Sequence, residues 1–172
     1  MAVYRGFPMA GFEITRIVDA PVEQVFGVFT DLDRMGNHCK DIVKIERVTN
    51  GPIAAGTVFK ETRSVFGRES TETLTFKEFD PPSHWVISGD FCGMIFLTNF
   101  NLQPEGDGTR LIVRTTVKAT NPIAWLMGLI SPLFMGSMKR AMKRDTDILC
   151  SVADGTWTEP DTEQDSDQDE AT

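Results

Sequence analysis

From Thr57 to Ala119 the sequence is a series of short strand-like segments separated by turns, and a long helical segment begins only after Asn121-Pro122. Strands joined by short turns pair as an antiparallel sheet, because parallel neighbours need long crossover connections. The apolar face of such a sheet must be covered, and only the last helical segment, ending near Val152, is long enough to cover it. The chain is therefore predicted to curl a sheet around its final helix.

The residues before this series of strands add one strand and two short helices. Phe12 to Val18 alternates between apolar and polar side chains, as a strand with one buried face does. Pro21 then suits the start of a helix, where the first N–H has no partner. A second short helix or turn is expected at Asp31–His38. Apolar residues follow Pro21 at helical spacing, at Val22, Val25, Phe26 and Phe29. With about seven strands, the predicted fold class is α+β.

Length and charge predict one folded domain with an acidic end. The chain has 172 residues and a net charge of −8, and a chain of this length can bury a sizeable core. From Asp154 onward there are eight acidic residues and no Lys or Arg, so the preceding part is formally neutral. We expect a flexible arm at 1–10, a ligand-binding domain at 11–153 and a disordered acidic tail at 154–172. A neutral body gives no reason to expect nucleic-acid binding.

Several short motifs carry a resemblance to a known superfamily over roughly Phe12 to Val152. The motifs are Ala20-Pro21-Val22-Glu23-Gln24-Val25-Phe26, Thr30-Asp31, Gly56-Thr57, Phe79-Asp80-Pro81-Pro82 and Gly106-Asp107-Gly108-Thr109. With the terminal helix, they resemble the START/Bet v 1-like helix-grip superfamily (SRPBCC), in its bacterial polyketide cyclase/dehydrase-like branch. The resemblance implies a hydrophobic cavity between sheet and helix. Members of the superfamily bind lipids, hormones or polyketides, or cyclise them.

The turn at Phe66-Gly67 predicts which side chains share a face of the central hairpin. A two-residue loop pairs Glu61 with Glu72 and places Arg63 on the same face. This face also carries most of the apolar residues of the hairpin, so it is expected to be concave. Two carboxylates and one guanidinium could orient a polar ligand group or supply a general base. The same three residues could equally form an ion network at the edge of the sheet.

Alternation along the other strands, and helical spacing in the last segment, predict the walls of the pocket. Methionine side chains there adapt to irregular shapes, which suits a pocket of broad specificity. Asp145 lies on the same helix face, either paired with a basic residue or at the mouth of the pocket. The candidate ligand-binding residues are Phe26, Phe59, Glu61, Arg63, Leu74, Phe76, Trp85, Ile87, Phe96, Thr98, Phe100, Val113, Thr115, Phe134, Met138 and Met142.

His38 completes the candidate proton-transfer residues, which are Glu61, Arg63, Glu72 and His38. It follows the second short helix, near the place where the cavity of the superfamily opens. No Cys/His spacing typical of a metal site and no phosphate-loop or dinucleotide motif is found, so neither metal nor cofactor is predicted.

The expected partners are a small hydrophobic ligand or lipid, with no nucleic acid. The absence of a signal peptide and the three scattered cysteines favour a cytoplasmic protein with reduced thiols. The uncharged segment Ile123–Met138 is too short to span a bilayer. The region Trp125–Met138, followed by paired bases, could instead rest on a membrane surface. The sequence predicts binding or transport of a hydrophobic molecule, with a polyketide cyclase, aromatase or dehydratase as the alternative.

Overall fold

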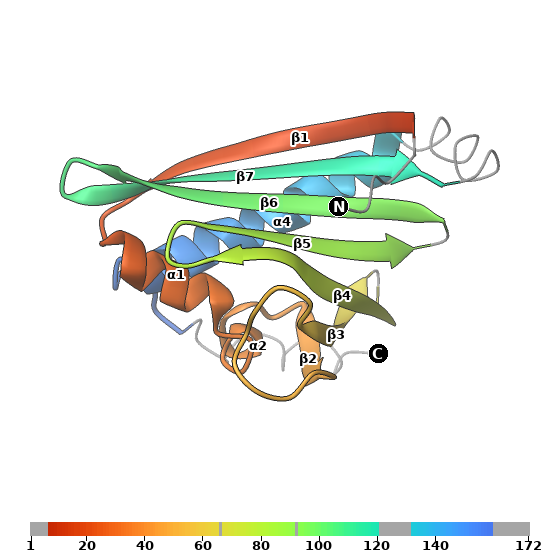
Figure 1. Cartoon of the computed structure of the whole chain (residues 1–172), viewed down its shortest axis with the longest axis horizontal. Helices are drawn as coiled ribbons and strands as arrows, with labels where there is room; N and C mark the ends of the chain where they lie inside the picture. Colours follow the sequence, from red (N-terminus) through yellow and green to blue (C-terminus); the bar gives the residue numbers. More distant parts are fainter. Residues whose placement is uncertain (1–6, 66, 92, 121–131, 160–172) are drawn as a thin grey trace, which may run out of the picture.

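A seven-stranded antiparallel sheet forms the body of the protein, and one long helix crosses one of its faces (Figure 1). The computed structural model describes residues 7–65, 67–91, 93–120 and 132–159. The elements are β1 (Phe7–Val18), α1 (Val22–Thr30), α2 (Met35–His38), β2 (Ile42–Arg47), β3 (Val58–Val65), β4 (Arg68–Asp80), β5 (His84–Phe91), β6 (Met94–Glu105), β7 (Gly108–Ala119) and α4 (Pro132–Ala153).

The sheet order is β1-β7-β6-β5-β4-β3-β2, with every neighbouring pair antiparallel. Strands β2 to β7 follow one another along the chain, while β1 pairs with β7 and leaves β1 and β2 as the two edges. Two short helices after β1 and a long helix on the sheet confirm the predicted α+β helix-grip fold. Strand β1 begins at Phe7, opposite Ala119, and so includes residues 7–10, which were expected to belong to the N-terminal arm.

Helix α1 begins directly after Pro21, which is its N-cap rather than part of its first turn. The Pro21 carbonyl accepts hydrogen bonds from the N–H groups of Gln24 and Val25, at 3.0 and 3.1 Å. The side chain of Gln24 donates to the carbonyl of Ala153 at 2.6 Å. This contact ties the first helix to the last turn of α4, so the two helices close one end of the sheet together.

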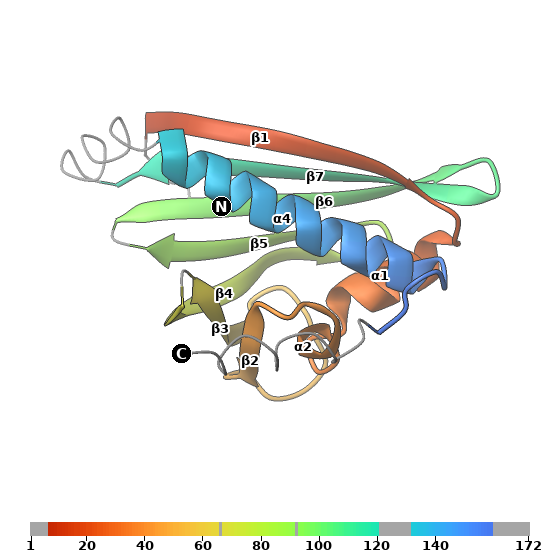
Figure 2. The same ribbon diagram turned by 180° about the vertical axis from the view of Figure 1, so that it is seen from behind.

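Helix α4 runs across the concave face of the sheet (Figure 2) and lies closest to α1, α2 and β1. The core includes fully buried residues where α1, α4 and the β6–β7 turn meet, among them Val18, Val25 and Leu111. Gly108 is required there, because a Cβ at this position would lie 2.4 Å from the carbonyl oxygen of Val18. Because α4 crosses the concave side of the sheet, the concave face of strands β3 to β6 lies under or beside this helix (Figure 2).

Within the described part of the chain, no helix is both long and apolar enough to cross a membrane. The region Trp125–Met138, for which a peripheral membrane contact was predicted, lies partly outside the described residues. That contact stays a prediction.

Candidate functional site

The central hairpin has the predicted register. Arg63 lies opposite Ser70, Glu61 opposite Glu72, and Phe59 opposite Leu74. Gly67 has a φ of 71°, a backbone conformation that residues with a Cβ rarely adopt. The tight turn at this glycine sets the pairing, and the pairing puts Glu61, Arg63 and Glu72 on the face that carries the buried Phe59.

Arg63 joins β3 to α4 through two carboxylates. Its Nε lies 2.5 Å from Oε1 of Glu61, and its Nη1 lies 2.5 Å from Oδ2 of Asp145. The side chains of Arg63, Glu61 and Asp145 are 28%, 12% and 9% exposed. Of the two alternatives for Asp145, pairing with a basic residue or a position at the mouth of the pocket, the structure shows the pairing. We call Glu61, Arg63 and Asp145 the ion cluster.

The ion cluster holds Arg63 firmly charged. Burial alone lowers the pKa of the guanidinium, but the charges of Glu61 and Asp145 and their hydrogen bonds outweigh it, so the pKa lies above its ordinary value. Buried Cys39 lies within electrostatic reach of the cluster. Burial, and then the charge of Asp145, raise the pKa of the Cys39 thiol to about 12. The thiol is therefore neutral and unreactive at physiological pH.

Glu72 is the acid of this face that remains without a partner. It is half-buried, and within the described residues no hydrogen bond or ion pair is found to its carboxyl group. Burial raises the pKa of Glu72, the charge of Glu61 adds to the rise, and Arg63 opposes it. A carboxyl with a raised pKa keeps its proton to a higher pH than an exposed glutamate does, which is the property that a general acid needs.

Gly89 lets the backbone of β5 approach the side chain of Leu74 closely on the concave face, near Glu72. It lies between Leu74 on β4 and Phe96 on β6, and the alternation along β5 turns the same face inward at Trp85 and at position 89. A Cβ at Gly89 would lie 2.8 Å from Cδ2 of Leu74 and 3.8 Å from Oε2 of Glu72. The side chain of Leu74 thus occupies the space that a side chain at position 89 would need, close to the carboxyl group of Glu72.

One end of the concave face is filled by aromatic rings. Trp85 stacks on Phe100 with ring centroids 4.7 Å apart, and Phe26 meets Trp85 edge-on at 5.3 Å. Phe76 is fully buried and lies 5.6 Å from Phe59. Trp85 is also fully buried, and its Nε1 has no hydrogen-bond partner among the described residues. Five of the predicted ligand-binding residues therefore form a closely packed aromatic cluster.

The other end of the same face is partly accessible to solvent. The inward-facing side chains there are half-buried rather than closed off, and they come from both the sheet and α4. Thr98 and Thr115 lie between the two ends, buried and hydrogen-bonded to each other at 3.1 Å, beside fully buried Val113. The side chain of Phe134 lies outside the described part. The half-buried apolar residues among the predicted ones at this end are Leu74, Ile87, Phe96, Met138 and Met142.

His38 lies in a different place from Glu61, Arg63 and Glu72. It lines a surface depression of about 510 Å³ together with Lys40, Asp41, Arg144 and Trp157. Its ring meets the ring of Trp157 edge-on at 4.7 Å, and its buried Nδ1 has no partner within the described residues. The structure thus brings three of the four candidate proton-transfer residues together and leaves the fourth apart.

Two residues of the site escaped the sequence reasoning. Gly89 continues the inward alternation of Trp85 and Ile87, so the alternation carried a signal for it. Phe79 packs against Phe26 at 5.5 Å because the β4–β5 register shifts between Phe76 and Glu78. Strict alternation would have turned Phe79 outward. In the described ranges, no group of three or more His, Cys, Asp or Glu side chains is placed to hold a metal ion.

The family is shown by a match over residues 9–149. The matching family is described as "Polyketide cyclase / dehydrase and lipid transport", and the chain belongs to it. This confirms the resemblance drawn from the short motifs. A comparison with curated proteins found no significant match to the chain.

Solved structures share the fold at low sequence identity. The chain is similar to the structure of Ara h 8.0201, with a TM-score of 0.69 and 16% identity over 84% of this chain and 97% of that one. Zhui aromatase/cyclase from Streptomyces sp. R1128 gives a TM-score of 0.66 and 17% identity, covering 84% and 93%. The di-domain ARO/CYC StfQ from the steffimycin biosynthetic pathway gives 0.72 and 13%, covering 88% of this chain and 52% of StfQ.

Proposed function

We propose that the protein binds or carries a small hydrophobic molecule or lipid between the sheet and α4. The observation that carries the proposal is the unequal burial of the concave face. Its aromatic end is packed shut, whereas the apolar side chains at its other end are half-buried. Apolar side chains that face inward yet remain accessible provide favourable area for an apolar ligand. The family description, which includes lipid transport, supports the same conclusion.

The chemistry around the accessible end describes the ligand further. Met138 and Met142 on α4 offer flexible thioether surfaces that adapt to an irregular apolar shape. Glu72 offers a carboxyl group without a partner in the described part, on the same face of β4 as the half-buried Leu74. A ligand with an apolar body and one hydroxyl or carbonyl group fits both features, since the polar group could share a hydrogen bond with Glu72.

Native mass spectrometry of freshly purified protein tests this proposal. We expect a fraction of the protein to carry a co-purified apolar molecule, and we expect the fluorescent apolar probe 1-anilinonaphthalene-8-sulfonate to compete for the same space. Met142→Trp should fill the space and weaken probe binding at least tenfold. Ile17→Trp, at a position 59% exposed on β1, is the matched control and should leave binding unchanged. Equal binding by both variants would contradict the proposed location.

A polyketide cyclase, aromatase or dehydratase is the second candidate, and the raised pKa of Glu72 favours it. The Glu72 carboxylate could take a proton from a carbon next to a ligand carbonyl. The protonated form could then return that proton to a leaving hydroxyl, which departs as water. The opposite charges of Arg63 and Glu61 would keep the net charge around Glu72 low during these proton transfers.

Incubation of the co-purified ligand, or of synthetic polyketide-like chains, with the protein distinguishes the two candidates. An enzyme should convert the ligand with loss of water, and Glu72→Gln should abolish conversion while leaving binding intact. A carrier should return the ligand unchanged in both cases. Conversion by Glu72→Gln at the wild-type rate would remove Glu72 from any catalytic role.

A further inference from the structure

Two buried hydroxyl groups lie side by side on the apolar concave face. Thr98 on β6 and Thr115 on β7 are directly opposite each other, and their oxygens are 3.1 Å apart. Thr98 is 7% exposed and Thr115 is fully buried. Their neighbours in the same row across the sheet are Ile87 on β5 and Phe76 on β4. The two hydroxyls therefore continue a row of apolar side chains, in which valine would match threonine in shape.

The hydrogen bond between the two threonines leaves one O–H donor over. Each hydroxyl group carries one proton, and the bond between Thr98 and Thr115 uses only one of the two. Within the described residues, no further hydrogen bond is found for either hydroxyl. A donor in apolar surroundings without an acceptor costs free energy, because it has lost its hydrogen bonds to water. A ligand that brings an acceptor to the spare O–H would recover this cost.

A second threonine pair, on the opposite face of the sheet, shows the difference that burial makes. Thr62 on β3 and Thr71 on β4 are opposite each other, with their oxygens 2.8 Å apart. Strand alternation turns them away from the face that carries Glu61 and Arg63. Thr71 is exposed, so water can accept from the O–H that this pair leaves over. The two pairs have the same chemistry, but only the concave pair lies where a bound ligand would supply the acceptor.

Thr98 adjoins the accessible end of the concave face. Half-buried Ile87 is its partner on β5, and half-buried Phe96 lies two residues along β6 on the same face. An apolar molecule that contacts these two side chains therefore lies next to the Thr98 hydroxyl, and the aromatic cluster can remain packed. Glu72 is farther away on this face. It lies four residues along β4 from Phe76 and two strands across from Thr98, a separation of roughly 16 Å.

We propose that Thr98 and Thr115 select, among apolar molecules, those with a carbonyl oxygen in the part that lies deepest. The spare O–H donates a hydrogen bond to this oxygen, whereas a hydrocarbon of the same shape leaves the donor unpaired. The inference rests on the proposed function and adds to it a second polar contact, roughly 16 Å from the one at Glu72. The ligand class is an extended, mainly apolar molecule with a ketone or ester carbonyl.

Two fluorescent naphthalene probes of nearly equal shape test the proposal. One is 6-propionyl-2-(dimethylamino)naphthalene, a ketone, and the other is its 6-propyl analogue, which lacks the carbonyl. The ratio of their dissociation constants is compared between the wild type and the double variant Thr98→Val with Thr115→Val, so that the different hydration of the two probes cancels. The wild type should favour the ketone about three- to tenfold more than the double variant does, the scale of one net hydrogen bond.

The emission of the bound ketone gives a second readout. This emission moves to longer wavelength when the carbonyl accepts a hydrogen bond, so it should lie at shorter wavelength in the double variant than in the wild type. Thr98→Ser with Thr115→Ser keeps both hydroxyls and should retain the preference for the ketone. Thr62→Val with Thr71→Val is the matched control, because it removes the same two groups from the opposite face, and it should behave as the wild type does.

The outcomes separate this inference from the proposed function. Without a probe, Thr98→Val with Thr115→Val should be at least as stable in urea as the wild type, because it removes a buried donor that has no acceptor. A clearly less stable double variant would mean that the protein itself satisfies both hydroxyls, which would overturn the inference. A preference for the ketone that survives in this variant, or falls equally in the control, would overturn it too and leave the proposed function intact. Binding of neither probe to the wild type would refute the proposed function, and the inference with it.

Discussion

Replacing Arg63 by methionine gives the sharpest test of the ion cluster. Methionine keeps an apolar stem of similar length but removes the charge that sits 2.5 Å from both Glu61 and Asp145. Two largely buried carboxylates would then face each other with no cation between them. Breaking a buried ion pair from one side costs about 3–5 kcal/mol. For a domain of this size, that loss lowers the melting temperature by roughly 6–20 °C.

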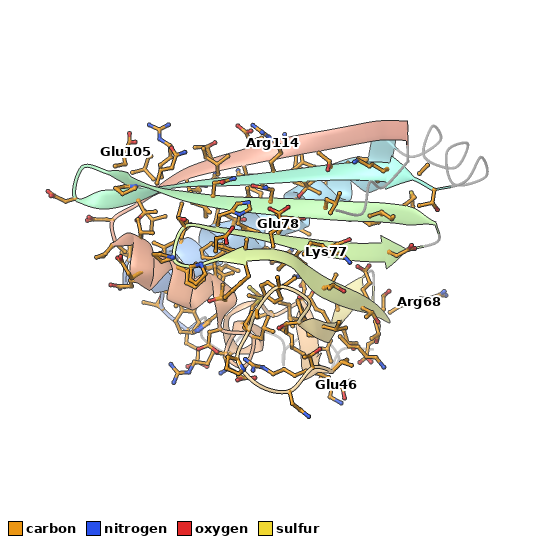
Figure 3. All side chains as sticks on the ribbon, in the orientation of Figure 1. Glu46, Arg68, Lys77, Glu78, Glu105 and Arg114 are labelled. Atoms are coloured by element: carbon orange, nitrogen blue, oxygen red, sulfur yellow. The ribbon has the colours of Figure 1, made fainter. Side chains whose placement is uncertain are left out.

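Arg114→Met is the matched control for this experiment. Arg114 lies 2.5 Å from Glu13, the same separation as in the ion cluster, but the two side chains are 64% and 44% exposed (Figure 3). Exposed pairs contribute about 0–1 kcal/mol. Urea unfolding should therefore show a much larger loss for Arg63→Met than for Arg114→Met.

A triple variant separates charge from packing. Glu61→Leu, Arg63→Met and Asp145→Leu together remove every charge of the ion cluster, and apolar replacement of a whole buried ion cluster is often neutral or stabilising. We expect the triple variant to recover most of the stability lost in Arg63→Met. Equal losses for Arg63→Met and Arg114→Met, or a triple variant less stable than Arg63→Met, would refute the electrostatic account.

Three further predictions concern single positions. Gly89→Leu should weaken binding of the fluorescent apolar probe at least tenfold, because its side chain collides with Leu74 and displaces this predicted wall residue; unchanged titration curves would contradict this. Because the pKa of Glu72 is raised on folding, its contribution to stability is full below the unfolded pKa near 4.5 and is lost as pH rises through the folded value. Glu72→Gln should therefore be more stable than wild type in urea at pH 7 and not at pH 4. In a Cys92→Ser background, buried Cys39 and Cys150, both with a pKa raised to about 12, should react with a disulfide reagent far more slowly in native protein than in urea; equal rates would contradict their burial.

Local signals in the sequence were sufficient for the fold and for the hairpin of the site. The turn at Gly67 and the alternation on either side of it determine the pairing of Glu61 with Glu72, because one residue of slippage would expose Phe59 and Phe76. The same local logic identified the strands and the last helix. These features depend on neighbours in sequence or on a single turn, so they can be read without knowing the tertiary structure.

Features that depend on how distant elements dock could not be read in the same way. Arg63 and Asp145 are 82 positions apart, and their pairing depends on the rotation and position of α4 over the sheet. The shift in register after Phe76 has no marker in the sequence, yet it turns Phe79 inward. The position of His38 beside Trp157 depends on the reversal of the chain after α4. Periodicity predicts on which side of a strand or helix a residue lies, but it does not predict which residues of another element that residue contacts.

Strand β2 has a consequence for the behaviour of the protein in a crowded solution. It is an edge of the sheet, it has only six residues, and Lys44, Glu46 and Arg47 along it are exposed. An open edge next to an apolar concave face invites a second chain to add a strand and begin aggregation. A short edge with alternating charges, in which Lys44 and Glu46 pair at 2.9 Å, discourages such an addition. At the β2 edge, the protein can thus keep an accessible apolar face without offering its backbone as a template for polymerisation.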